Sequence, residues 1–160
     1  MANLLALDQA SQTTGYAVFK DGKLFTYGKF SFDDDIAERL VKIRKKVLSL
    51  IEEYQIEEVA FEDIQMQNNV MNNVQTFKVL SEVFGVILET LKEINIQYTI
   101  VSSNTWKSTL KIKGKSRAEQ KRAAQQYVID TYEVKPTQDE ADAICIGTHI
   151  VKTSSGFDWS

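Results

Sequence analysis

The stretch "LLALDQASQTTGYAVFKDGKLFTYGKF" (residues 4–30) decides the fold. It opens with an apolar run that predicts a strand ending at Asp8. Residues 14–30 follow as two β-rich runs on either side of Asp21-Gly22, a dipeptide that favours a tight hairpin turn. We therefore expect three opening strands that form an antiparallel meander.

Helices and strands alternate after this meander. Apolar residues spaced three and four apart predict helices, and short apolar runs predict strands. The predicted helices cover residues 33–55, 72–93, 116–133 and about 139–152, and the predicted strands cover 57–63 and 95–101. This order predicts an α/β fold with a mixed central sheet, helices on both faces, and later strands parallel to the first. A helical turn over residues 103–110 is expected to have Ser103 or Asn104 as its cap.

Composition limits the possible functions. The 160 residues, 43% hydrophobic and 26% charged, fit one globular domain, which we place at residues 1–152, with a flexible tail at 153–160. Cys145 is the one cysteine, so no disulfide can form within the chain and a reducing compartment is expected. No apolar run approaches the ~18 residues that span a bilayer. We expect a cytoplasmic protein without membrane contact or organic cofactor.

Charge is unevenly distributed along the chain. Residues 107–122, "KSTLKIKGKSRAEQKR", carry +6, so the remainder carries −9 although the whole chain has a net charge of only −3. Local patches, not total charge, decide whether a protein binds phosphates. The residues that we expect to contact phosphates of a partner are Lys111, Lys113, Lys115, Arg117 and Lys121.

Carboxylates stand at the ends of predicted elements. Asp8 and Glu62 end apolar strands, and open α/β sheets place their sites at the carboxyl ends of strands. Asp139 and Asp142 are three apart on the last helix and share a face, whereas Glu140 points about 100° away. Carboxylates gathered in one place repel one another unless cations neutralise them, and oxygen ligands suit Mg²⁺ or Mn²⁺. Two such ions ~4 Å apart are the standard device for phosphodiester cleavage.

Each acid also has an ordinary structural interpretation. Asp8 could cap a turn with a nearby hydroxyl, Glu62 could be surface charge, and Asp139 could cap the last helix. The combination of acids at two strand ends with a DxxD pair that opens an apolar helix favours the metal site.

Four motifs carry a family resemblance. "LLALDQASQTTGYAVF", "EEVAFEDIQMQNN", "SSNTWKSTL" and "TQDEADAICIGTHI" resemble, in order, motifs of the RuvC family of Holliday-junction resolvases, within the ribonuclease H-like superfamily. The resemblance covers nearly the whole chain. It implies a ribonuclease H-like fold and a homodimeric endonuclease that cuts branched DNA, four-way junctions and by extension forks. It also implies two Mg²⁺ ions per active site, for which Mn²⁺ substitutes. The compact size hints at a phage-type member.

The resemblance assigns roles to individual residues. It implies that Asp8, Glu62, Asp139 and Asp142 are the catalytic metal ligands. Lys107, in "NTWK", matches a lysine of the family's catalytic region.

Two further positions are less closely matched. A second family lysine falls among Lys113, Lys115 and Lys121, of which we favour Lys121. The family often has a base-stacking aromatic residue three positions after the catalytic glutamate, where this chain has Gln65. Residues 65–75 either supply polar DNA contacts instead or form a solvated loop.

The helix predicted at residues 72–93 is apolar over more than one stripe. One stripe suffices to pack on the sheet, so the surplus favours a two-fold partner, with Gly85 allowing close approach. The alternative is that the basic helix of the same chain covers it. Tyr16, Trp106 and Phe77 are expected to fill the core.

Two other functions stay open at this point. One is a ribonuclease H-like nuclease that processes RNA, and the other is a non-catalytic protein that binds branched DNA. The complete acid set argues against the second, because a pure binder would gain from fewer carboxylates near phosphates.

Overall fold

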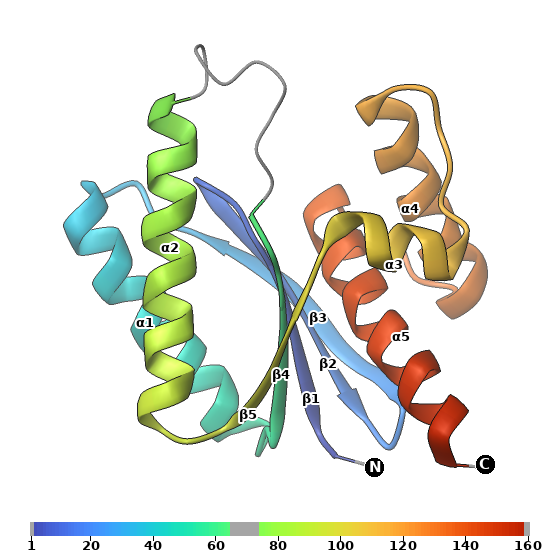
Figure 1. Cartoon of the computed structure of the whole chain (residues 1–160), viewed down its shortest axis with the longest axis horizontal. Coiled ribbons are helices and arrows are strands. Elements are labelled where there is room, and N and C mark those ends of the chain that lie inside the picture. Colours follow the sequence, from blue (N-terminus) through green and yellow to red (C-terminus); the bar gives the residue numbers. More distant parts are fainter. Residues whose placement is uncertain (1, 65–73, 159–160) are drawn as a thin grey trace.

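A five-stranded mixed sheet lies at the centre of the computed structural model, which describes residues 2–64 and 74–158, with side chains up to residue 154 (Figure 1). The strands are β1 (Leu4–Gln9), β2 (Thr13–Lys20), β3 (Lys23–Ser31), β4 (Glu58–Glu62) and β5 (Gln97–Val101). Their order in the sheet is β3-β2-β1-β4-β5. The meander β1-β2-β3 is antiparallel, whereas β4 runs parallel to β1 and β5 parallel to β4. The predicted fold class is confirmed.

The turn between β2 and β3 follows the sequence signal. Asp21 and Gly22 both have positive φ, 54° and 75°. A two-residue turn of this kind matches the twist of the strands that it joins, and Asp-Gly tolerates it well.

Helices cover both faces of the sheet (Figure 1). They are α1 (Ile36–Glu53), α2 (Val74–Glu93), α3 (Ser103–Leu110), α4 (Arg117–Tyr132) and α5 (Gln138–Asp158). Successive residues of a strand point to opposite faces. Accordingly, Leu5 and Leu7 of β1 pack in a core with α1 and α2, whereas Leu4 and Ala6 pack in a second core with α3, α4 and α5. The basic helix α4 packs on α5, so it does not cover α2 as the alternative for residues 72–93 supposed.

Helix α5 packs directly on the sheet. Residues 141–150 are all buried, including the thiol of Cys145. A Cβ at Gly15 of β2 would collide with the backbone carbonyl of Asp139, and one at Gly147 would collide with the ring of Phe19. Two glycines therefore allow α5 to lie closer to β2 than any larger residue would permit.

Two boundaries differ from the sequence prediction. Helix α3 is capped by Ser102, whose hydroxyl accepts the N–H of Thr105 at 3.1 Å, so the expectation of a cap at Ser103 or Asn104 is wrong. Ser103 is instead buried inside the first turn. Helix α5 continues to Asp158, beyond the predicted end near Lys152. The division into a domain at residues 1–152 and a flexible tail at 153–160 stays a prediction.

The described helices contain none that is long and apolar enough to cross a membrane.

Candidate active site

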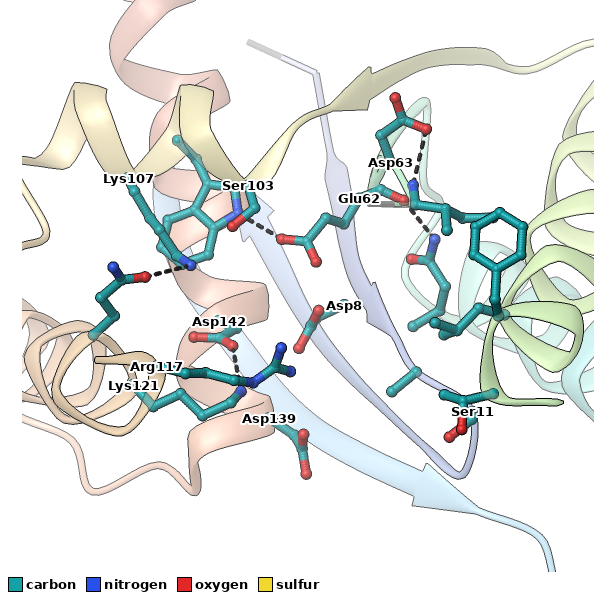
Figure 2. A pocket seen from close by; sticks show the side chains of 18 residues that line it. Asp8, Ser11, Glu62, Asp63, Ser103, Lys107, Arg117, Lys121, Asp139 and Asp142 are labelled. Carbon is teal, nitrogen blue, oxygen red and sulfur yellow. Dashed lines mark hydrogen bonds and ion pairs between the residues drawn. The ribbon is translucent and has the colours of Figure 1, made fainter. Parts of the chain in front are cut away.

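A cleft of about 570 Å³ opens where β1 and β4 end, between the start of α2 and helices α3, α4 and α5 (Figure 2). Its lining includes the four acids predicted as metal ligands, together with three of the predicted cations. These residues are Asp8, Glu62, Asp139, Asp142, Lys107, Arg117 and Lys121. Four carboxylates from three separate chain segments thus face the same cleft, together with three positively charged side chains.

The pairing of β1 with β4 brings the first two acids together. Leu7 pairs with Phe61 in parallel register, so Asp8 and Glu62, the next residues, leave the sheet at the same edge. The side chain of Gln9 donates from Nε2 to the backbone oxygen of Glu62 at 2.6 Å and ties the two strand ends. The carboxyl ends of parallel strands are therefore the source of this half of the site.

The start of α5 supplies the other two acids, and a capping box explains their arrangement. The N–H of Thr137 donates to the Glu140 carboxylate at 2.8 Å, and the Thr137 hydroxyl accepts the N–H of Glu140 at 3.4 Å. Glu140 is therefore engaged at the helix end, which leaves Asp139 and Asp142 for the cleft. The prediction that Asp139 and Asp142 share a face without Glu140 is confirmed, and the cap is Thr137, not Asp139.

Burial and mutual repulsion dominate the electrostatics. Desolvation, followed by the charges of Glu62 and Asp142, raises the pKa of Asp8 well above its ordinary value. Burial likewise raises the pKa of Glu62, against which a hydrogen bond from Trp106 acts. Burial raises the pKa of Asp142, and the nearby ammonium of Lys121 opposes that rise. Closely spaced carboxylates repel one another when ionised, and positive charges beside them stabilise the ionised form.

Of the two lysines that line the cleft, Lys121 forms an ion pair with an acid and Lys107 binds a neighbouring amide. Lys121 Nζ is 3.2 Å from Asp142 Oδ2, and Lys107 Nζ donates to Gln120 Oε1 at 3.1 Å (Figure 2). Arg117 also lines the cleft.

The other predicted DNA contacts lie outside the cleft. Lys111, Lys113 and Lys115 are exposed on the connection between α3 and α4. The structure thus separates the basic set into a part within the cleft and a part beside it.

Two aromatic residues differ from each other although both were expected to fill the core. Trp106 is 1% exposed, as expected, but its Nε1 donates to Glu62 Oε2 at 2.7 Å. Phe77 is 37% exposed and lines the cleft, so the expectation was wrong for it. The reason is that residues 74–78 precede the part of α2 that packs on the sheet, and all of them are exposed. Gln65 and most of the segment 65–75 lie outside the described residues.

The donor set fits a divalent cation. Among residues 2–64 and 74–158, no three side chains of His, Cys, Asp or Glu form a ready-made cage for an ion. The four carboxylates nevertheless share one cleft, and their oxygen atoms are the ligands that hard cations such as Mg²⁺ prefer. Cations held there would offset both the desolvation and the repulsion from Glu62 and Asp142 that raise the pKa of Asp8.

A family model and a relative of known activity point to the same family. The family model "Crossover junction endodeoxyribonuclease RuvC" matches residues 4–149. The crossover junction endodeoxyribonuclease RuvC of Ehrlichia canis (strain Jake) is 30% identical over 149 residues, which cover 90% of this chain and 92% of that protein.

Solved structures show the same fold. T. thermophilus RuvC in complex with a Holliday junction substrate matches with a TM-score of 0.74 and 18% identity over 96% of each chain. The Fowlpox virus resolvase in complex with Holliday junction DNA matches with a TM-score of 0.64 and 14% identity, over 95% of this chain and 98% of that one. None of these matches bears on the phage source that the size hinted at, which stays a prediction.

Proposed function

This chain belongs to the RuvC family of crossover junction endodeoxyribonucleases, and from that premise we propose that it hydrolyses phosphodiester bonds in Holliday junctions. We propose forked DNA as a second substrate. One observation supports the proposal above the others: four carboxylates from three chain segments face one cleft, and two lysines lie beside them.

Family membership implies a nuclease that depends on a divalent metal. We propose that the metal is Mg²⁺, replaceable by Mn²⁺, and that Asp8, Glu62, Asp139 and Asp142 hold two ions. When bound, such ions supply an activated water and stabilise the departing oxygen.

The positively charged side chains in and beside the cleft have two roles in this proposal. Lys121 holds Asp142 in place, and Lys107 and Lys121 together face the negative charge that develops on the phosphate in the transition state. Arg117 and the exposed lysines beside the cleft bind neighbouring phosphates and position the DNA without reading its bases. These exposed lysines are Lys111, Lys113 and Lys115.

We propose that the active form is a homodimer. One cleft cuts one strand, whereas resolution of a four-way junction needs two symmetric cuts, which a two-fold dimer would supply. The surface that best suits such a partner lies along α2 and the edge strand β5, where Gly85, Leu88 and Tyr98 line a shallow groove. Ile94 and Ile100 beside it are 40% and 38% exposed.

A cleavage assay tests the proposed function. The purified protein is incubated with Mg²⁺ and labelled four-way junction, fork, linear duplex or RNA–DNA hybrid. We expect paired nicks in the junction, weaker cleavage of the fork and little cleavage of the duplex. Preferred cleavage of the hybrid would favour the RNA-processing alternative, and binding without any cleavage would favour the non-catalytic one.

Two variants give the assay its control. Asp142→Asn removes one negative oxygen at nearly constant shape, so we expect cleavage to be abolished while junction binding is retained or strengthened. Glu140→Gln changes the adjacent carboxylate, which is engaged by Thr137, and should retain cleavage. Normal cleavage by Asp142→Asn together with an inactive Glu140→Gln would contradict the assignment of these residues.

A further inference from the structure

The hydrogen bond between Trp106 and Glu62 joins the core to the acid cluster. Trp106 Nε1 donates to Glu62 Oε2 at 2.7 Å, which is short for a nitrogen donor (dashed line at Glu62 in Figure 2). An indole offers one donor and no acceptor, and a buried indole N–H requires a partner. Trp106 is 1% exposed, and this carboxylate oxygen is the hydrogen-bond partner of its N–H.

The helix that carries Trp106 is itself fixed to α5. Trp106 and Leu110 belong to the core that contains Ala141 and Ile144 of α5. One turn further along α3, Thr109 Oγ1 lies 2.9 Å from His149 Nδ1. A continuous set of contacts therefore leads from Glu62 through α3 to the helix that presents Asp139 and Asp142.

Glu62 is the last residue of β4, so its side chain projects from the end of that strand. Its carboxylate has two oxygens, and the indole N–H engages Oε2, which leaves Oε1 for the cleft. In Figure 2 the Glu62 carboxylate extends into the space between Asp8 and Ser103.

We propose that Trp106 is a positioning residue that fixes the orientation of the Glu62 carboxylate relative to the Asp139–Asp142 pair. This inference rests on the proposed role of Glu62 as a metal ligand. Its consequence is that one rotamer of Glu62 is selected before any ion arrives, so less ordering remains to be done on binding. Loss of the indole N–H should therefore weaken metal binding as well as slow cleavage.

The test compares two substitutions of Trp106 with a matched core variant. Trp106→Phe removes the donor and part of the ring, whereas 3-benzothienylalanine at position 106 keeps the bicyclic shape and replaces N–H by sulfur. Leu110→Ala weakens the same helix core without touching Glu62. The readouts are the apparent affinity for Mn²⁺, from its effect on the melting temperature in the absence of DNA, and the single-turnover rate on a four-way junction.

We expect both Trp106 variants to lose about tenfold to a hundredfold in rate, the usual range for a hydrogen bond to a charged group, and to bind Mn²⁺ more weakly. Leu110→Ala should lower the melting temperature but keep its affinity for Mn²⁺. Equal Mn²⁺ affinity in the benzothienyl variant and the unchanged protein would overturn the inference, and so would an equal loss of affinity in Leu110→Ala.

Glu62→Gln separates this inference from the proposed function. If the unchanged protein cleaves no junction, the proposed function is wrong. If Glu62→Gln cleaves as well as the unchanged protein, the proposed role of Glu62 as a metal ligand is wrong and the inference about Trp106 fails with it. If Glu62→Gln is inactive while both Trp106 variants behave like the unchanged protein, only the role of Trp106 is overturned.

Discussion

Helices α5 and α2 lie on opposite faces of the same sheet and are built in opposite ways (Figure 1). Ten consecutive residues of α5, 141–150, are buried. Helix α2 buries only a stripe, Val79, Val83, Ile87, Thr90 and Leu91, and leaves its first turn exposed. A helix that is buried on all sides cannot shift without disturbing the core, whereas a helix with one buried stripe keeps surface for other contacts.

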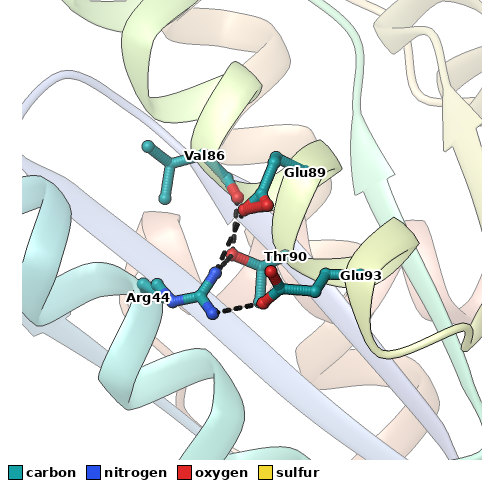
Figure 3. A network of polar contacts seen from close by, with 5 residues as sticks. All are labelled: Arg44, Val86, Glu89, Thr90 and Glu93. Atoms are coloured by element: carbon teal, nitrogen blue, oxygen red, sulfur yellow. Dashed lines mark hydrogen bonds and ion pairs between the residues drawn. The ribbon is translucent and has the colours of Figure 1, made fainter.

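The contacts that hold the two helices in place also differ. Helix α5 approaches β2 so closely at Gly15 and Gly147 that a Cβ at either position would collide with the neighbouring element. Helix α2 is joined to α1 by Arg44, which donates to Glu89 and Thr90 at 3.1 Å and to Glu93 at 2.6 Å (Figure 3). Ion pairs between side chains as exposed as these add little to stability, because water screens the charges. The contrast is what the proposed dimer requires: α5 holds the start of the acid pair against the sheet, and α2 keeps the exposed surface that we propose for a partner.

Among the changes that test this contrast between the two helices, the largest effect is expected where α5 meets β2. Gly15→Ala places a Cβ against the Asp139 carbonyl, so the start of α5 must move away from Asp8. Overpacking of this kind costs about 1–3 kcal/mol of unfolding free energy. A displacement of about 1 Å at a reacting centre can cost about a hundredfold in rate, and we expect a loss of that order. Urea unfolding and single-turnover cleavage measure the two effects.

Gly147→Ala is the matched control for Gly15→Ala. It overpacks the same helix, but against the ring of Phe19, which can give way more easily than a backbone carbonyl, and well past Asp142 in sequence. We expect a lower unfolding free energy with a much smaller loss of cleavage. Equal losses of cleavage in the two variants would show that general loosening of α5, not the placement of Asp139, controls the rate.

Local patterns were sufficient to predict most of this architecture. The apolar run, the two β-rich runs and the Asp-Gly turn between them predicted the meander, because these signals depend on neighbouring residues only. Asp8 and Glu62 could be placed at one sheet edge because parallel strands end together. Helical spacing gave the shared face of Asp139 and Asp142.

What was missed depends mainly on tertiary contacts. The hydrogen bond from the Trp106 indole to Glu62 joins residues 44 positions apart in the sequence, and the local sequence "NTWK" does not predict that partner. The need for Gly15 arises only when α5 is in place. One local signal was readable, since Thr137 and Glu140 have the capping-box spacing that Ser116 and Glu119 also show.

The second prediction concerns the surface of α2. A Cβ at Gly85 meets nothing within 4 Å, so Gly85→Glu should leave the folded chain intact and even favour the helix. In the proposed dimer the same change puts a charge between two closely spaced helices. We expect sedimentation at micromolar concentration to give twice the 18.2 kDa chain mass for the unchanged protein and the chain mass for the variant.

Ser49→Glu on the exposed side of α1 is the control, because it adds the same charge away from the groove. Val83, by contrast, is 1% exposed and unsuitable for this purpose, because a charge there would disrupt the core. Unaltered circular dichroism must accompany the change in mass. A Gly85→Glu protein that remains dimeric, or an unchanged protein that sediments as a monomer while it nicks junctions in symmetric pairs, would contradict the assignment of α2.

The smallest expected effect concerns the DNA path on the α5 side of the molecule. Lys113 and Lys115 are exposed beside the cleft but do not line it, so they should contact phosphates without taking part in catalysis. Each phosphate contact contributes about 0.9 to the slope of log affinity against log salt concentration, so the double variant Lys113→Ala, Lys115→Ala should lower its magnitude by about 1.8. Fluorescence anisotropy with a labelled junction between low and moderate salt measures this slope.

The double variant Lys45→Ala, Lys46→Ala on α1 is the control. It removes the same charge from the other face of the sheet and should leave the slope unchanged. If the Lys45, Lys46 variant changes the slope and the Lys113, Lys115 variant does not, the DNA crosses the face of the sheet that carries α1 and α2. That face would then bind DNA, and our assignment of it to a protein partner would be wrong.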